Sequence, residues 1–176
     1  HRLGALKAVC DIDAERGQSI SSTFGVPLCD VEDLVRSAEI DAVVIATPAE
    51  DHASVALEAL RGGKHVFIEK PMALTVPEAL TVRDAGNRAG RVVMVGHLLQ
   101  YHPGFIALKR TVEEGTLGRI QYIYSNRLNF GKVRKKENVF WSFAPHDISM
   151  ILSLTGEMPV SVETHGSYYL NRSVAD

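Results

Sequence analysis

The chain has 176 residues, of which 45% are hydrophobic and 23% are charged, and its formal net charge is −2 at pH 7. This length and apolar content suffice for one sizeable core and part of a second. The near-neutral charge offers no basic surface to nucleic acid or anionic membranes, and no apolar run approaches the roughly 20 residues of a membrane span. Cys10 and Cys29 lack metal-ligand spacing, so we expect a reduced, cytoplasmic setting.

Short apolar segments alternate with helical patterns over residues 6–96. We expect strands over 6–11, 25–29, 41–48, 64–71 and 91–96, and helices over 13–25, 30–38, 50–63 and 75–90. Strands that alternate with helices at this spacing are typical of βαβ units. The predicted fold class is therefore α/β, with a doubly wound parallel sheet.

The pattern changes after Gly96. Phe105, Leu108 and Val112 predict a helix, and a second helical pattern covers 148–155. Alternating residues predict long strands over 119–130 and 160–170. We therefore expect two domains, a parallel α/β domain over 1–98 and part of an α+β domain with an antiparallel sheet over 99–176.

Polar or conformationally special residues gather where the predicted strands end. In an open parallel sheet, ligands bind outside the carboxyl ends of the strands. One charged strand end is readily explained by contact with water, whereas four in succession favour a binding crevice. The residues at these ends are Asp11, Thr47, Pro48, Glu69, Lys70, Pro71, Gly96 and His97.

Asp11 indicates the ligand. A carboxylate at the end of the second strand of a Rossmann-type fold accepts hydrogen bonds from the adenosine ribose, about 20 residues after a Gly-rich turn. Counting back that far passes His1, so we expect a piece of a longer protein that lacks the first strand and its turn, and that is unstable alone. A carboxylate also repels a 2′-phosphate, and no arginine follows until Arg16, so NAD is favoured over NADP. The alternative, that Asp11 caps the next helix, stays open.

Three segments, AVCDID, VVIATPAEDHASVALEALRGGKHVFIEKPMALT and VVMVGHLLQYHP, resemble in this order the Gfo/Idh/MocA family of NAD(P)-dependent sugar oxidoreductases. The most specific part of the likeness is Glu-Lys-Pro at 69–71, preceded by Thr47, Pro48 and His52. The segment IYSNRLNFGKVRKKENVFWSFAPHDISMIL resembles, more narrowly, nucleotide-sugar 3-dehydrogenases of surface-polysaccharide biosynthesis. These oxidise the C3 hydroxyl of UDP-N-acetylglucosaminuronic acid.

The resemblance implies that Lys70 and His146 are catalytic, with Lys70 beside the nicotinamide and the substrate hydroxyl. A charged Lys70 stabilises negative charge on the substrate oxygen, and His146 takes the proton near neutral pH. The reverse assignment, with Lys70 as the base, stays open. The expected cofactor-binding residues are Asp11, Thr47, Pro48, His52, Glu69, Lys70, Gly96 and His97. The expected substrate-binding residues are Lys70, Arg127, Asn129, Trp141 and His146.

One departure from the family pattern concerns the residue four positions before His146. Many members carry an aspartate there, whereas this chain has Ser142, which puts a carboxylate-assisted base in doubt. Two roles stay open for Trp141, which either stacks on a sugar or uracil or packs in the core. A basic loop with Lys132, Arg134, Lys135 and Lys136 either contacts a diphosphate or is simply solvated. We expect no metal site, because no histidine and carboxylate set has ligand spacing.

Several functions stay open beside the nucleotide-sugar dehydrogenase. They are an inositol or glucose dehydrogenase, an NAD-dependent glycosidase of the same fold, and a non-enzymatic NAD-binding regulator. The expected partner is a nucleotide-sugar substrate, with no nucleic acid and no membrane. We expect the full-length protein to form a homo-oligomer, either a dimer or a tetramer.

Overall fold

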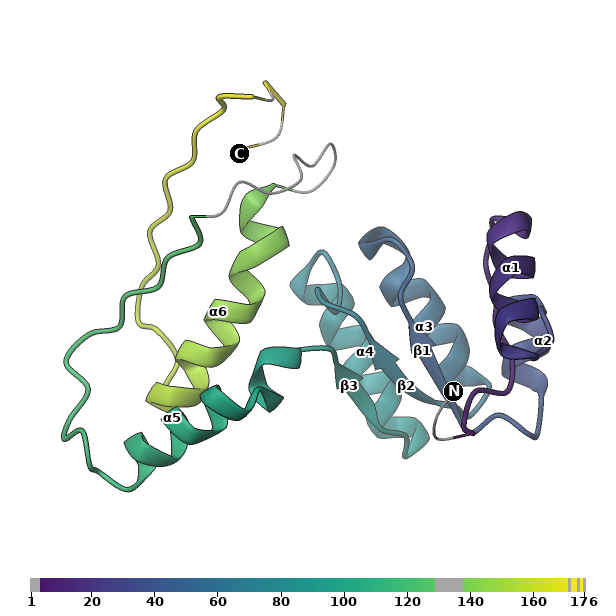
Figure 1. Ribbon diagram of the computed structural model, residues 1–176, viewed down its shortest axis with the longest axis horizontal. Helices are drawn as coiled ribbons and strands as arrows, with labels where there is room; N and C mark the ends of the chain where they lie inside the picture. Colours follow the sequence, from purple (N-terminus) through teal and green to yellow (C-terminus); the bar gives the residue numbers. More distant parts are fainter. Residues whose placement is uncertain (1–3, 129–137, 171, 174, 176) are drawn as a thin grey trace. The chain divides into compact units, whose positions relative to one another are not determined.

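The computed structural model describes residues 4–128, 138–170, 172–173 and 175 (Figure 1). The chain divides into two compact units, His1–Gly96 and His97–Asp176. The division falls between Gly96 and His97, whereas the residue pattern predicts a boundary after residue 98. Among the described residues, none of the helices combines the length and the apolar content that a membrane span requires.

A parallel sheet forms the centre of the first unit. It consists of β1 (Ala42–Ile45), β2 (His65–Ile68) and β3 (Val93–Val95), in the order β1-β2-β3. Ile45 lies opposite Ile68, which lies opposite Val95. These branched apolar residues suit strands that are covered by helices. The parallel α/β fold expected from the alternation is confirmed.

The two strands expected first in the chain are much shorter in the structure. Segments 6–11 and 25–29 are joined by a single parallel bridge between Val9 and Leu28. The bridge is held by hydrogen bonds from the Val9 amide to the Pro27 carbonyl and from the Cys29 amide to the Val9 carbonyl. Within the described residues neither segment pairs with β1, and two paired segments without a third neighbour are only marginally stable as a sheet.

Over residues 4–96, four α-helices and one 3₁₀ helix accompany the sheet: α1 (Ala14–Phe24), α2 (Val31–Arg36), η1 (Ala49–Asp51), α3 (His52–Arg61) and α4 (Val76–Ala89). Local signals explain their ends. Thr75 and Glu78 form a capping box at the start of α4, and Gly90 ends it in the left-handed conformation with φ of 61°. Helix α3 packs against α4, β1 and β2, and the core residues between them include Ala56, Val66 and Val82.

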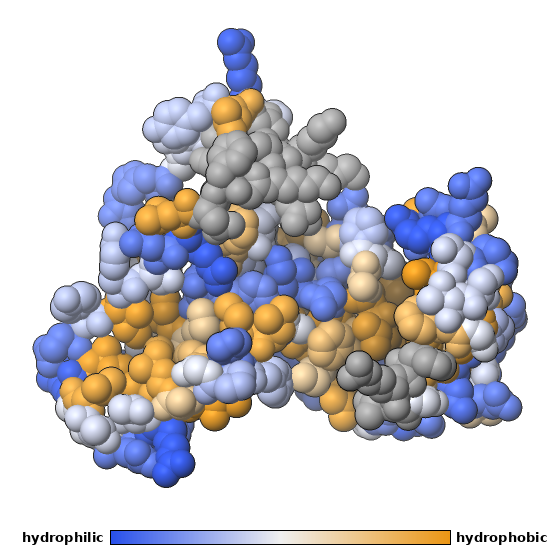
Figure 2. Space-filling view, viewed as in Figure 1, coloured by the Kyte–Doolittle hydropathy of each residue, from blue (hydrophilic) through white to orange (hydrophobic). Residues whose placement is uncertain are grey.

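The second unit is built from α5 (Pro103–Glu113), α6 (Val139–Thr155) and the 3₁₀ helix η2 (Leu98–Tyr101). Helix η2 contacts both α5 and α6, and α5 contacts α6. Phe105 on α5 is buried, whereas Ile106 and Leu108 are exposed. Figure 2 shows the resulting apolar surface over α5.

The antiparallel sheet expected in the second unit is absent from the part that the structure describes. Residues 119–128 and 157–170 form no strand. Tyr122 and Tyr124, which alternate as a strand would require, are 84% and 79% exposed. Alternation favours an extended backbone, but a strand also needs a partner that pairs with its amides and covers one face. The described residues of these two segments form no strand pairing, so this expectation is wrong for them.

Candidate functional site

Backbone hydrogen bonds align the carboxyl ends of the three strands at one edge of the sheet. The Glu69 amide donates to the Ile45 carbonyl at 2.9 Å, and the Gly96 amide donates to the Ile68 carbonyl at 2.7 Å. These bonds continue the parallel ladder beyond the last residue of each strand. The predicted residues of the turns after β1, β2 and β3 therefore belong to one edge, where parallel sheets bind ligands.

Gly96 makes room for the carboxylate of Glu69. A β-carbon at Gly96 would lie 3.1 Å from Oε2 of Glu69 and 3.2 Å from Cζ of Phe67. The same Oε2 accepts a hydrogen bond from the Lys70 amide at 3.3 Å. Glu69 and Lys70 are both half-buried, so the acid and the base that end β2 are partly sheltered from water.

His52 lies beneath this edge and touches the turns after both β1 and β2. Its side chain is 2% exposed. Nδ1 lies 2.7 Å from the carbonyl oxygen of Pro71, and Nε2 lies 2.9 Å from the carbonyl oxygen of Thr47. A direct contact of His52 with the cofactor stays a prediction. The burial and the two backbone contacts favour an indirect role.

Asp11 is paired with Arg16 in a way that the sequence did not predict. The Asp11 carboxylate accepts from Nε of Arg16 at 2.6 Å and from Nη2 at 2.8 Å, and it also accepts from the Asp13 amide at 2.9 Å. These bonds lower the pKa of Asp11 from 3.8 to about 2, with the Arg16 side chain as the main cause. Helix α1 is capped by Asp13, so Asp11 is not its N-cap. An ionised carboxylate suits the hydroxyls of an NAD ribose.

In the second unit, His97 packs against His146 of α6. The ring centroids are 6.4 Å apart and the planes meet at 84°, an edge-to-face arrangement. Nδ1 of His97 is buried and makes no hydrogen bond within the described residues, and burial lowers the pKa of this side chain below 6.5. Ser142, one turn before His146 on α6, is also buried. Sequence reasoning missed the histidine pair, because nothing local relates residue 97 to residue 146.

Arg127 is held by Asp147, the neighbour of His146. Its Nε donates to Oδ2 of Asp147 at 2.9 Å and its Nη2 donates to Oδ1 at 3.3 Å, while the Ser125 hydroxyl donates to Oδ1 at 3.1 Å. A role for Arg127 in substrate binding stays a prediction, as does one for Trp141, which is half-buried. Asn129 and the basic residues 132–136 lie outside the described residues.

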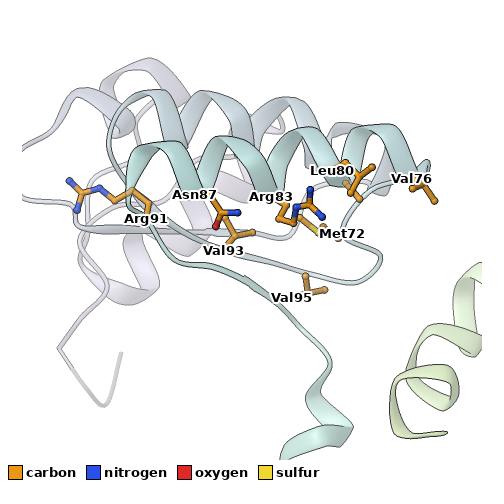
Figure 3. Close-up of a pocket in the computed structure, with 9 residues that line it drawn as sticks. Met72, Val76, Leu80, Arg83, Asn87, Arg91, Val93 and Val95 are labelled. Carbon is orange, nitrogen blue, oxygen red and sulfur yellow. The ribbon is translucent and has the colours of Figure 1, made fainter. Parts of the chain in front are cut away.

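A separate cavity of about 370 Å³ lies between α4 and β3 (Figure 3). Its wall is mainly apolar, with Arg83, Asn87 and Arg91 among the lining residues. None of the residues predicted from the sequence lines it. In the described part of the chain, no cluster of three histidine, cysteine or carboxylate side chains could hold a metal ion.

Comparison with known proteins identifies the class of the chain. A family model described as "Oxidoreductase family, NAD-binding Rossmann fold", that of Gfo/Idh/MocA proteins, matches residues 1–97. The chain belongs to this family. Among the described residues, the ionised carboxylate of Asp11 fits the ribose hydroxyls of the dinucleotide.

Individual relatives cover most of the chain. It is 26% identical over 97% of its length to the inositol 2-dehydrogenase of Rhizobium meliloti, of which it covers 53%. Its fold matches apo scyllo-inositol dehydrogenase of Lactobacillus casei with a TM-score of 0.73, at 23% identity over 86% of this chain and 47% of that one. It also matches KijD10, a 3-ketoreductase of Actinomadura kijaniata solved with NADP and TDP-benzene, with a TM-score of 0.58 at 27% identity over 62% and 34% of the two chains.

These comparisons support the resemblance to the Gfo/Idh/MocA family more than the narrower resemblance to nucleotide-sugar 3-dehydrogenases. The chain spans about half the length of the curated relatives that it matches. Several of these relatives are named inositol 2-dehydrogenase, and the narrower likeness to nucleotide-sugar 3-dehydrogenases stays a prediction. Lys70 and His146 belong to different units, so their convergence on one hydroxyl also stays a prediction.

Proposed function

We propose that the complete protein is an NAD-dependent dehydrogenase that oxidises a secondary hydroxyl of a sugar or a cyclic polyol. The observation that carries this proposal is the order of residues after β2. There, Glu69 and Lys70 follow a buried strand at the ligand-binding edge of an NAD-binding fold. Lys70 is half-buried at this edge, and its ammonium group can donate a hydrogen bond to a substrate oxygen there.

The chemistry divides between the two units. NAD, when bound, supplies the hydride acceptor. Lys70 donates a hydrogen bond to the substrate oxygen and stabilises the negative charge that develops as the hydroxyl proton leaves. His146 takes that proton as general base. The carboxylate of Asp11 accepts from the ribose hydroxyls of the cofactor.

We propose further that the substrate is a nucleotide sugar such as UDP-N-acetylglucosaminuronic acid, oxidised at C3. The support is the resemblance of residues 123–152 to nucleotide-sugar 3-dehydrogenases, with Ser142 in place of the aspartate of many other family members. Inositol is the second candidate, because relatives of this chain carry the name inositol 2-dehydrogenase.

A substrate panel separates these candidates. The complete protein is mixed with NAD and either UDP-N-acetylglucosaminuronic acid, UDP-N-acetylglucosamine, myo-inositol or glucose, and NADH formation is followed in a single turnover. We expect NADH with the UDP-uronic acid. Reduction with myo-inositol alone would move the assignment to the second candidate. Tight NAD binding without reduction by any of the four compounds would favour the regulator.

Variants at the two catalytic positions test the mechanism. Lys70→Met and His146→Asn should each lower the single-turnover rate by about 10²- to 10⁴-fold, with NAD binding largely retained. Lys109→Met is the matched control, because Lys109 lies on α5 and pairs only weakly with Glu113 at 3.8 Å. An unchanged rate in Lys70→Met or His146→Asn would show that the assigned role is wrong.

A further inference from the structure

We infer that His52 is a positioning residue that joins the turn after β1 to the turn after β2 and so places Lys70 for catalysis. This inference rests on the proposed function. It goes beyond that function because it assigns the placement of the catalytic lysine to a buried side chain.

The contacts of His52 define the link. Nδ1 reaches the carbonyl oxygen of Pro71, the residue next to Lys70, and Nε2 reaches the carbonyl oxygen of Thr47. Both separations, 2.7 and 2.9 Å, are those of hydrogen bonds. A carbonyl oxygen only accepts, so a neutral ring donates to one of the two carbonyls, according to its tautomer, and donates to both only when both nitrogens carry hydrogen. The rigid ring therefore sets the spacing of the two turns.

The position of His52 in the fold makes this link specific. His52 is the first residue of α3, whose Ala56, Ala59 and Leu60 are buried in the core of the first unit. The ring is thus anchored from the core side and bonded to backbone on the ligand side. The sheet ladder ends at the bond from the Glu69 amide to the Ile45 carbonyl. Beyond that point, the His52 ring provides a further tie between the two turns.

The chemistry of the link explains its importance for catalysis. Buried backbone carbonyls need hydrogen-bond donors. When the imidazole is removed, the carbonyl of the buried Pro71 must find another donor, and the exposed Thr47 loses its tie to the ring, so the two turns are free to shift. A displacement of about 1 Å at a catalytic group can lower the rate by about 10²-fold. The Lys70 ammonium is attached to one of these turns.

Two substitutions at His52 and one control test the inference in the complete protein. His52→Leu keeps an apolar side chain of moderate size but removes both ring nitrogens, whereas His52→Gln keeps an amide that can donate to one carbonyl. Leu60→Ala is the matched control, because Leu60 is 3% exposed on the same helix and contacts the core. It lowers stability through packing alone.

We expect kcat for NAD reduction to fall about 10²-fold in His52→Leu and less in His52→Gln, with weaker NAD binding in both. Leu60→Ala should lose thermal stability while retaining kcat and the affinity for NAD at a temperature where it is folded. If His52→Leu does not fold, His52→Gln decides the outcome. Wild-type kcat and NAD affinity in a folded His52 variant would overturn the inference.

A third measurement is independent of activity. In protein labelled with ¹⁵N-histidine, NMR should show a ring N–H signal of His52 that is protected from exchange with water, and this signal should be missing in His52→Gln. The absence of a protected signal would overturn the inference. If the unsubstituted protein reduces no NAD with any substrate, the proposed function fails, while NAD affinity and the NMR signal still decide the role of His52.

Discussion

Gly86 marks a close approach between α4 and β3, and its substitution by alanine should destabilise the protein. A β-carbon at this position would lie 2.4 Å from Cγ2 of Val93 and 3.4 Å from the carbonyl oxygen of Arg91. Carbon atoms normally meet at about 3.5–4.0 Å, so the helix and the strand must separate by about 1 Å. Val93 cannot easily turn away, since β-branched side chains are stiff at χ1. Figure 3 shows Val93 beside α4.

The expected loss follows from two opposing effects. Alanine is favoured over glycine in a helix interior by about 1 kcal/mol. Overpacking a well-filled core costs about 1–3 kcal/mol, and an overlap of this size places Gly86→Ala near the upper end. The net decrease in the free energy of unfolding is therefore about 2 kcal/mol. Because β3 leads directly to Gly96, catalytic activity should also decrease.

Urea unfolding of the complete protein, followed by circular dichroism, measures this change as a shift of the midpoint at constant slope. Gly17→Ala on α1 is the matched control. Its β-carbon would meet Cδ1 of Leu28 at 2.7 Å, the end of a flexible side chain that can rotate away. Combining Gly86→Ala with Val93→Ala should recover about 1–2 kcal/mol relative to additivity. A Gly86→Ala protein as stable as the parent would refute the reasoning, and strict additivity would show that Val93 is the wrong neighbour.

Three further predictions concern the ligand-binding edge and the histidine pair. Asp11→Ala should weaken NAD binding. Arg16→Ala should strengthen the preference for NAD over NADP, because this substitution leaves the Asp11 carboxylate without its cation. Titration with both dinucleotides measures the two affinities, and an unchanged preference in Arg16→Ala would contradict the prediction. Gly96→Ala should push the Glu69 carboxylate aside and lower kcat/KM, and a wild-type value would show that this crowding is harmless. Burial lowers the pKa of His97 in the folded protein. As the pH falls below about 6.5, the unfolded chain therefore binds more protons than the folded protein does, and the free energy of unfolding decreases. His97→Phe should reduce that loss in urea titrations at pH 7 and pH 5, and equal losses in parent and variant would rule this explanation out.

The amino-acid sequence determined those features that depend on neighbours along the chain. Thr75, Glu78 and Gly90 mark both ends of α4, because helix caps involve residues within one turn of each other. The apolar residues of β2 and the polar residues that follow it placed Glu69 and Lys70 at the edge of a parallel sheet. The same reasoning wrongly predicted a strand over residues 119–128, because an alternating pattern favours an extended backbone but does not supply the neighbouring strand that must pair with it.

Tertiary structure alone decided which distant side chains meet. Asp11 and Arg16 were both noted in the sequence, yet only the start of α1 turns the guanidinium back onto the carboxylate. His52 was predicted to bind the cofactor, which stays a prediction, and only the packing of α3 shows that its ring meets two backbone carbonyls. His97 meets His146 because η2 contacts α6. Such contacts depend on how helices pack against a sheet or against each other, and local sequence patterns specify which face of a helix is buried without specifying what lies opposite that face.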